Sequence, residues 1–202
     1  MTPASTSPGD AAEDARRVIG YSPRVPVSED RTITPVPHSH CSGCGAAFGH
    51  GKPGWPRTCG RCGTTAYGNP LPVAVALQPA YDTRGTGLVV ITRAIAPARG
   101  ATALPGGYVD HREDWRSAVV RELREETGID AAARDVRLAD VMSGAEGHLL
   151  VFGLLPPRPA GQFAHWGPTE ETEGSALLRR PRELAFPLHT LAARAWFEGR
   201  YG

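Results

Sequence analysis

The stretch that decides the fold is residues 105–129, which read PGGYVDHREDWRSAVVRELREETGI. Residues 105–107 predict a tight turn without side chains, where backbone groups can approach a metal or a phosphate. Apolar residues then recur three and four positions apart, which is the spacing of an amphipathic helix. Asp114 is a typical N-cap and Gly128 a typical helix end. The stretch therefore predicts a turn followed by a helix over residues 114–127.

The expected helix carries carboxylates on its apolar face. At about 100° per residue, Glu122 and Glu126 fall on the same side as Val119 and Leu123, and Glu125 lies to one side. An unpaired buried carboxylate costs several kcal/mol or changes its pKa. The pattern leaves two interpretations open, a solvated acidic face with Arg–Glu pairs or a set of oxygen ligands for Mg²⁺ or Mn²⁺.

The spacing of residues in this stretch resembles the Nudix box. The matching positions are Gly107, Glu113, Arg121, Glu122, Leu123, Glu125, Glu126, Gly128 and Ile129. The resemblance implies a Nudix hydrolase, an α/β/α sandwich with a mixed sheet that uses a divalent metal and a water to cleave a pyrophosphate linkage. It also implies a set of Mg²⁺ or Mn²⁺ ligands, namely Glu122, Glu125 and Glu126, with the main-chain carbonyl of Gly107 or of Gly106 completing the set.

Further roles follow from the same resemblance. Glu122 is expected to be the general base, and Arg121 and Glu113 are expected to orient the carboxylates. In some Nudix proteins a distant loop supplies the general base. An acidic cluster in a loop rich in Gly and Pro is therefore an alternative source of the base here. The other interpretation of this cluster is a solvated surface loop. That cluster consists of Glu170, Glu171 and Glu173.

Two aromatic residues are candidates for substrate binding. Tyr108 directly follows the glycine pair, and Trp166 precedes the acidic cluster. Stacking on a nucleobase contributes about 1–3 kcal/mol per base. Packing within the fold is the other interpretation for both side chains.

The rest of the chain after residue 70 alternates short apolar runs with turn residues, and it ends with a second helical pattern. Strands, a helix, more strands and a helix in this order predict an α+β fold with a mixed sheet between helices. The expected strands cover residues 73–77, 88–92, 101–104, 136–142 and 148–155, and the second helix covers 188–201.

Four cysteines form two CxxCG units, at Cys41 and Cys44 and again at Cys59 and Cys62. Four thiolates at this spacing are typical of a structural Zn²⁺ site. A thioredoxin-type redox pair is the alternative, but no strand–helix pattern surrounds either unit. The segment holding them has little apolar content, so it requires a staple such as zinc to fold.

These patterns predict three parts. Residues 1–36 are rich in Pro, Ser and Thr and are expected to be disordered, residues 37–69 form the zinc ribbon, and residues 70–202 form the Nudix domain. A ribbon before a Nudix domain resembles the bacterial NADH pyrophosphatases. Those proteins carry an SQPWPF-like segment shortly after the Nudix box, whereas residues 139–153 of this chain read ADVMSGAEGHLLVFG. The sequence is similar instead to shorter ADP-ribose pyrophosphatase-like proteins, which favours ADP-ribose or a dinucleotide as substrate.

The composition limits the remaining function classes. With 22 Lys+Arg against 21 Asp+Glu, the net charge of +1 disfavours nucleic-acid binding by bulk electrostatics. No apolar run of about 18 residues and no signal-peptide core is evident, so a cytoplasmic protein without membrane contact is expected. A nucleotide-sensing or nucleic-acid-binding module that uses the ribbon, and a biosynthetic hydrolase of a prenyl or sugar diphosphate, remain alternatives. A homodimer is also left open.

Overall fold

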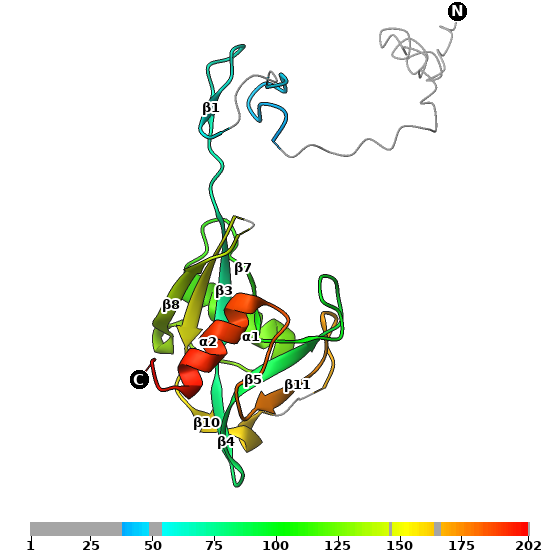
Figure 1. The fold of residues 1–202 in the computed structure, drawn as a ribbon, viewed down its shortest axis with the longest axis vertical. Helices are drawn as coiled ribbons and strands as arrows, with labels where there is room; N and C mark the ends of the chain where they lie inside the picture. The colour runs from blue at the N-terminus through cyan, green and yellow to red at the C-terminus, as the bar shows by residue number, and fades with distance from the viewer. Residues whose placement is uncertain (1–37, 49–53, 146, 164–166, 202) are drawn as a thin grey trace, which may run out of the picture. The chain divides into compact units, whose positions relative to one another are not determined.

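The computed structural model describes residues 38–48, 54–145, 147–163 and 167–201 (Figure 1). By its internal contacts the chain divides into two compact units, Met1–Ala66 and Tyr67–Gly202. The expected disordered segment, residues 1–36, lies outside the described residues.

The first unit is built on the two cysteine turns. In each turn a glycine adopts positive φ, 69° at Gly45 and 73° at Gly63, which is a conformation that glycine adopts without steric cost. The amide of Gly45 donates to the carbonyl of Cys41 at 2.8 Å, and the amide of Gly63 donates to that of Cys59 at 2.9 Å. The second turn joins two short antiparallel strands, β1 (Arg57–Thr58) and β2 (Thr65–Ala66).

The second unit contains two mixed sheets in the part of the chain that the structure describes. One sheet has the order β7-β3-β9-β8, with β3 and β9 parallel, and the other has the order β10-β4-β5-β11, with β6 paired to β5. The strands are β3 (Leu71–Leu77), β4 (Pro79–Asp82), β5 (Gly85–Arg93), β6 (Thr102–Ala103), β7 (Gly106–Tyr108), β8 (Arg137–Ser143), β9 (His148–Leu154), β10 (Arg158–Pro159) and β11 (Thr172–Leu178).

The sheets lie between two helices, α1 (Trp115–Thr127) and α2 (Pro187–Phe197) (Figure 1). Successive strand residues point to opposite faces, so a central strand such as β3 contributes to two cores. Ala74 and Ala76 of β3 pack in the cluster that contains the buried face of α1. Val75 and Leu77 pack in the cluster that contains the buried face of α2. The α+β prediction and the α/β/α sandwich are therefore confirmed. Two short 3₁₀ turns, η2 (Ala133–Asp135) and η3 (Ala160–Gln162), complete the described elements.

Some expectations about single elements were wrong. Gly106 and Gly107 were expected in a turn but lie in β7, because their backbone pairs with Val75 and Ala74 of β3. The acidic cluster was expected in a loop, which holds for Glu170 and Glu171 but not for Glu173, because β11 begins at Thr172 and pairs with β5. The small residues of β11 have low strand propensity, and the strand forms by pairing with β5, which is distant in sequence. The second helix ends at Phe197, four residues earlier than expected.

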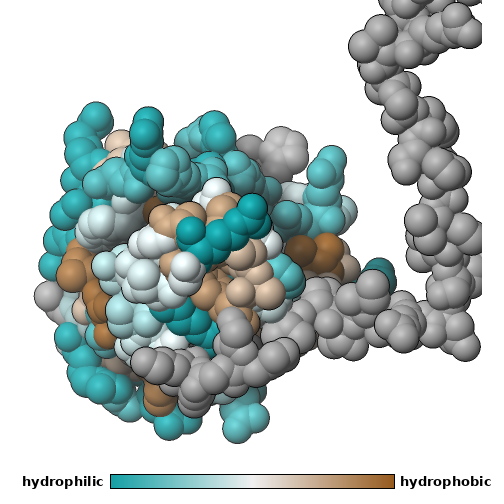
Figure 2. Space-filling view, turned by 90° about the horizontal axis from the view of Figure 1, so that it is seen from above, coloured by the Kyte–Doolittle hydropathy of each residue, from teal (hydrophilic) through white to brown (hydrophobic). Residues whose placement is uncertain are grey.

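In the described part of the chain, no helix is both long enough and apolar enough to cross a membrane. Figure 2 shows separate hydrophobic patches among hydrophilic side chains on the face seen from above. The large exposed apolar residues come from many different elements, among them Leu71, Tyr81, Leu138 and Leu191.

Helix α1 packs closely on β9 at a glycine. A Cβ added at Gly153 would lie 2.8 Å from Cγ2 of Val119 on α1 and 2.7 Å from Cγ1 of Val136. Because both neighbours are branched and buried, Gly153→Ala is expected to lower the free energy of unfolding by about 1–3 kcal/mol. Gly161→Ala is the matched control, since nothing lies within 4 Å of its added Cβ. Urea denaturation measures both variants, and equal stabilities would contradict this packing.

Candidate active site

Helix α1 places two carboxylates against the sheet. The carboxylate of its N-cap, Asp114, accepts from the amide of Arg116 at 2.9 Å, and the helix ends at Gly128 with φ 72°. Both caps agree with the prediction. Glu122 is 8% exposed and Glu126 4%, so the carboxylates expected on the apolar face are indeed buried. The side chain of Glu125 is 50% exposed.

Arg121 connects the carboxylates of the box. Its Nε and Nη2 donate to both oxygens of Glu113, at 2.9 and 2.8 Å. Its Nη1 donates to Oε1 of Glu122 at 2.6 Å and to Oε2 of Glu125 at 3.2 Å. Nη2 also donates to the main-chain carbonyl of Tyr108 at 2.9 Å, which ties the helix to the end of β7.

These contacts hold Glu113 in its charged form. The hydrogen bonds from Arg121, together with that from the amide of Asp110, lower the pKa of Glu113 to about 2. The carboxylates also raise the pKa of Arg121 above its ordinary value. The Glu113–Arg121 pair is therefore ionised throughout the neutral range, and it fixes the guanidinium that reaches Glu122.

The two glycines of β7 lie directly against the buried carboxylates. The amide of Gly106 donates to Oε2 of Glu126 at 2.8 Å. A Cβ added at Gly107 would lie 2.6 Å from Oε1 and 2.7 Å from Oε2 of Glu122. Only glycine leaves room for this carboxylate, so the strand backbone and the helix carboxylates together form the floor of the site.

Both buried carboxylates are destabilised in their charged forms. Burial, together with the charges of Glu122 and Glu171, raises the pKa of Glu126 to about 8, although the amide of Gly106 and the charge of Arg93 act in the opposite direction. Burial also raises the pKa of Glu122, although the hydrogen bond from Arg121 opposes this. A divalent cation bound between two such carboxylates would stabilise their charged forms.

Strand β11 closes the site behind the last turn of α1. The hydroxyl of Thr172 donates to the main-chain carbonyl of Glu126 at 3.1 Å. Of the three alternative bases, Glu171 precedes this residue and its charge acts on both buried carboxylates. Glu170 is exposed, and Glu173 is exposed in the bulge of β11 between Thr172 and Gly174.

A family model for the NUDIX domain matches residues 70–198 of this chain. The chain belongs to the Nudix family. It is 48% identical over 42 residues to an ADP-ribose pyrophosphatase of Methanocaldococcus jannaschii, a match that covers 21% of this chain and 25% of that protein. The chain thus aligns with about a quarter of the length of this curated relative.

Two solved structures are similar in fold to this Nudix protein. One is a NUDIX hydrolase from Nitrosomonas europaea, which is 23% identical with a TM-score of 0.61, covering 80% of this chain and 92% of that chain. The other is the NUDIX domain of Shewanella oneidensis NrtR complexed with ADP ribose. It is 18% identical with a TM-score of 0.51, covering 63% of this chain and 88% of that chain.

Of the two candidate substrate-binding aromatic residues, Tyr108 lies among the described residues. Tyr108 is 56% exposed, and its hydroxyl lies 3.1 Å from Nε2 of His148 on β9. The two rings are tilted by 38° with centroids 5.9 Å apart. Trp166 lies outside the described residues.

Sequence reasoning missed Arg93 and His148. Both become neighbours of the box only through strand pairing, β5 with β11 and β9 with β3. No motif surrounds Arg93 in the sequence. Its charge alone does not distinguish it, because arginine is abundant in this chain.

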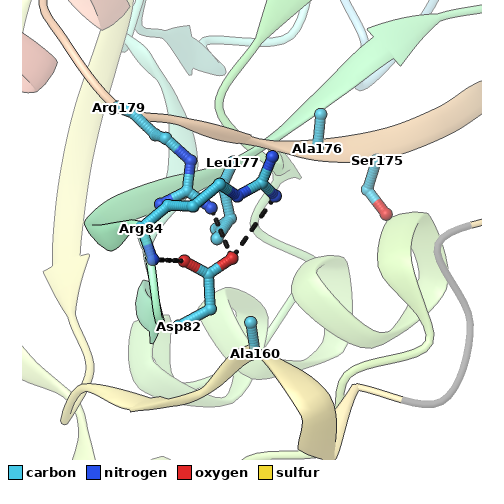
Figure 3. Close-up of a pocket in the computed structure, with 7 residues that line it drawn as sticks. All are labelled: Asp82, Arg84, Ala160, Ser175, Ala176, Leu177 and Arg179. Carbon is cyan, nitrogen blue, oxygen red and sulfur yellow. Dashed lines mark hydrogen bonds and ion pairs between the residues drawn. The ribbon is translucent and has the colours of Figure 1, made fainter.

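A pocket of about 380 Å³ lies elsewhere, between the β4–β5 turn and β11 (Figure 3). Asp82 accepts from Arg179 at 2.6 Å and from Arg84 at 3.4 Å, and these contacts join the turn to the end of β11. None of the site residues expected from the sequence lines this pocket.

The four cysteines of the first unit converge. Their sulfurs all lie within 4.8 Å of one another, and the Cys41–Cys62 and Cys44–Cys59 pairs are each 3.7 Å apart. A disulfide requires about 2.05 Å, so neither pair is bonded. A tetrahedral zinc with Zn–S bonds of about 2.3 Å places its sulfurs about 3.8 Å apart, so the cluster has the dimensions of such a site.

Removing the charge of Glu113 is expected to loosen Arg121. Glu113→Gln should lower the free energy of unfolding by about 1–3 kcal/mol at pH 7, since hydrogen bonds to a charged group are lost. The pKa of Glu113 is lower in the folded state than its ordinary 4.5, so its stabilisation is present above pH 4.5 and disappears as the pH falls toward 2.

Urea denaturation between pH 7 and pH 3.5 should therefore show the two proteins converging in acid. Glu198→Gln is the control, because the Glu198–Arg200 pair is exposed at the surface. A pH-independent difference between wild type and Glu113→Gln would contradict this account.

Proposed function

We propose that this protein hydrolyses a pyrophosphate bond in a nucleoside diphosphate joined to another moiety, with ADP-ribose or a dinucleotide-like compound as the favoured substrate. The observation that carries the proposal is the burial of Glu122 and Glu126 against the side-chain-free backbone of Gly106 and Gly107. The substrate class is supported by two similar proteins whose descriptions name ADP-ribose.

We propose that these residues bind Mg²⁺ or Mn²⁺, which requires the carboxylates to move closer together, because among the described residues the four cysteine sulfurs are the group that lies within 4.8 Å. Glu122, Glu125 and Glu126 offer carboxylate oxygens, and the main chain of Gly107 adds a carbonyl without a side chain in the way. Burial raises the pKa of Glu122 and of Glu126, so a cation bound beside them would stabilise their charged forms. When bound, such an ion stabilises charge on phosphate oxygens and lowers the pKa of a bound water.

The base, positioning and substrate-binding roles are assigned to individual residues of the site. Glu122 is the proposed acceptor of the proton of the attacking water. Arg121 holds one oxygen of Glu122 at 2.6 Å and is itself held by Glu113, so both are positioning residues. Glu171 is the alternative base. Tyr108 and Trp166 are proposed to contact the nucleoside end of the substrate.

Glu126→Gln is expected to reduce metal-dependent hydrolysis at least about 100-fold, because the amide is a poorer ligand for a hard cation. The assay supplies Mg²⁺ or Mn²⁺ and a panel of ADP-ribose, NADH, NAD⁺, diadenosine polyphosphates, nucleoside triphosphates, sugar nucleotides and prenyl diphosphates. Glu183→Gln is the matched control, since Glu183 is an exposed carboxylate outside the box. Its activity should equal that of the wild type.

The outcome of this panel separates the candidate functions. Turnover of a nucleoside diphosphate compound that Glu126→Gln loses supports the proposal. Turnover of a prenyl diphosphate alone would replace the substrate class. No turnover by the wild type, with a compound that still raises the melting temperature, would point to a nucleotide-sensing module instead.

We also propose that residues 37–69 form a zinc ribbon ahead of a Nudix domain at residues 70–202. Four convergent sulfurs at the spacing of a tetrahedral site support this assignment. The described part of the ribbon contains few apolar side chains, so the metal supplies the stabilisation that a hydrophobic core would otherwise give.

The purified protein is accordingly expected to contain about one zinc per chain, which atomic emission measures. Cys59→Ser should lose the metal, because a serine hydroxyl is a poor zinc ligand. Ser42→Ala, an exposed change between the first two cysteines, should retain it. Native protein that is free of zinc, or that carries two disulfides by mass spectrometry, would refute the ribbon.

A further inference from the structure

Arg93 lies at the end of β5, beside the last turn of α1. It pairs with Thr172 of β11, and the hydroxyl of Thr172 binds the main-chain carbonyl of Glu126. The backbone pairing therefore places Arg93 at the side of the site formed by β5 and β11.

The guanidinium of Arg93 is anchored at two points. Its Nε donates to the carbonyl of Pro97 at 2.8 Å, within the turn that follows β5. Its central carbon lies 5.2 Å from the centroid of the Phe186 ring. The hydrogen bond sets the direction of the side chain, and the ring contact supports one face of the guanidinium plane.

These contacts leave the outer edge of the guanidinium available. Within the described ranges, neither terminal nitrogen of Arg93 has a hydrogen bond or ion pair. By contrast, Arg121 binds three carboxylates, and Arg179 binds Asp82 and the carbonyl of Gly85.

Phe186 is itself part of the site's support. It is the N-cap residue of α2, and its ring packs on that of His189 with centroids 5.0 Å apart. Nδ1 of His189 accepts from the amide of Leu104 at 3.2 Å, two residues before Gly106. The start of α2 therefore holds both the guanidinium of Arg93 and the chain that leads to the glycine pair.

We propose that Arg93 binds a phosphate of the diphosphate substrate through its two terminal nitrogens, and that Phe186 positions it. A planar fork of donors matches two phosphate oxygens, which a lysine ammonium cannot do. The assignment rests on the proposed function, because it places the diphosphate between Arg93 and the carboxylates of α1.

Calorimetry in EDTA measures binding of inorganic pyrophosphate and of ADP-ribose without any metal. Arg93→Gln is expected to weaken binding at least tenfold, with a similar rise in KM and a smaller change in kcat when Mg²⁺ is supplied. Arg93→Lys should lie between the two. Arg99→Gln is the control, because it removes the same charge from an exposed position in the same turn, and it should change binding less than twofold.

Phe186→Leu tests the positioning role. It keeps an apolar side chain but removes the ring under the guanidinium, so it should raise KM severalfold at an unchanged pH optimum. Melting curves accompany every variant, and Arg93→Lys serves as the comparison if Arg93→Gln does not fold.

The results separate this inference from the proposed function. Hydrolysis with the same KM in Arg93→Gln and wild type overturns the role of Arg93 alone. Pyrophosphate binding that depends on Arg93, without hydrolysis of any compound, supports Arg93 and overturns the proposed hydrolysis. Wild-type protein that binds neither compound overturns both.

Discussion

Two carboxylates lie on the face of α1 that packs against the sheet, and the rest of the second unit is arranged around them. A helix normally buries apolar side chains on that face, and Val119 and Leu123 do so here. Glu122 and Glu126 share this face, where Glu122 accepts a hydrogen bond from Arg121 and Glu126 accepts one from the amide of Gly106. The molecule accommodates them by removing side chains from the opposing strand, because β7 presents Gly106 and Gly107 at this point.

The surrounding contacts keep this arrangement rigid. Arg121 links the helix to the Tyr108 carbonyl and to Glu113, and Thr172 links the last turn of the helix to β11. Behind β7, His189 of α2 holds the amide of Leu104. Burial lowers the pKa of His189 to about 3, so its ring stays neutral and can accept this bond at any physiological pH. The site is therefore supported from both layers of helix.

The sequence predicted the parts of this site that lie close together along the chain. The caps of α1, the burial of Glu122 and Glu126, and the α+β order of elements all follow from local periodicity and residue type. The role of the glycines was predicted only in part. They were expected in a turn, but their pairing with β3 makes them a strand, and pairing between distant segments leaves little signal in either one.

The remaining features depend on contacts between distant segments. Strand β11 begins with Thr, Glu, Gly and Ser and has few β-branched residues, so its sequence predicts a loop. Arg93 enters the site through the pairing of β5 with β11, and Phe186 reaches it from α2. Neither residue belongs to a motif that spacing alone reveals.

We propose that the carboxylates on the buried face of α1 form a divalent-metal site. Anomalous diffraction from crystals soaked in Mn²⁺ tests it most directly. The account predicts an anomalous peak at about 2.0–2.3 Å from oxygens of Glu122 and Glu126, with the carbonyl of Gly107 nearby. Crystals that contain Mn²⁺ elsewhere but show no peak at these carboxylates, with Glu126 still bonded to the Gly106 amide, would contradict it.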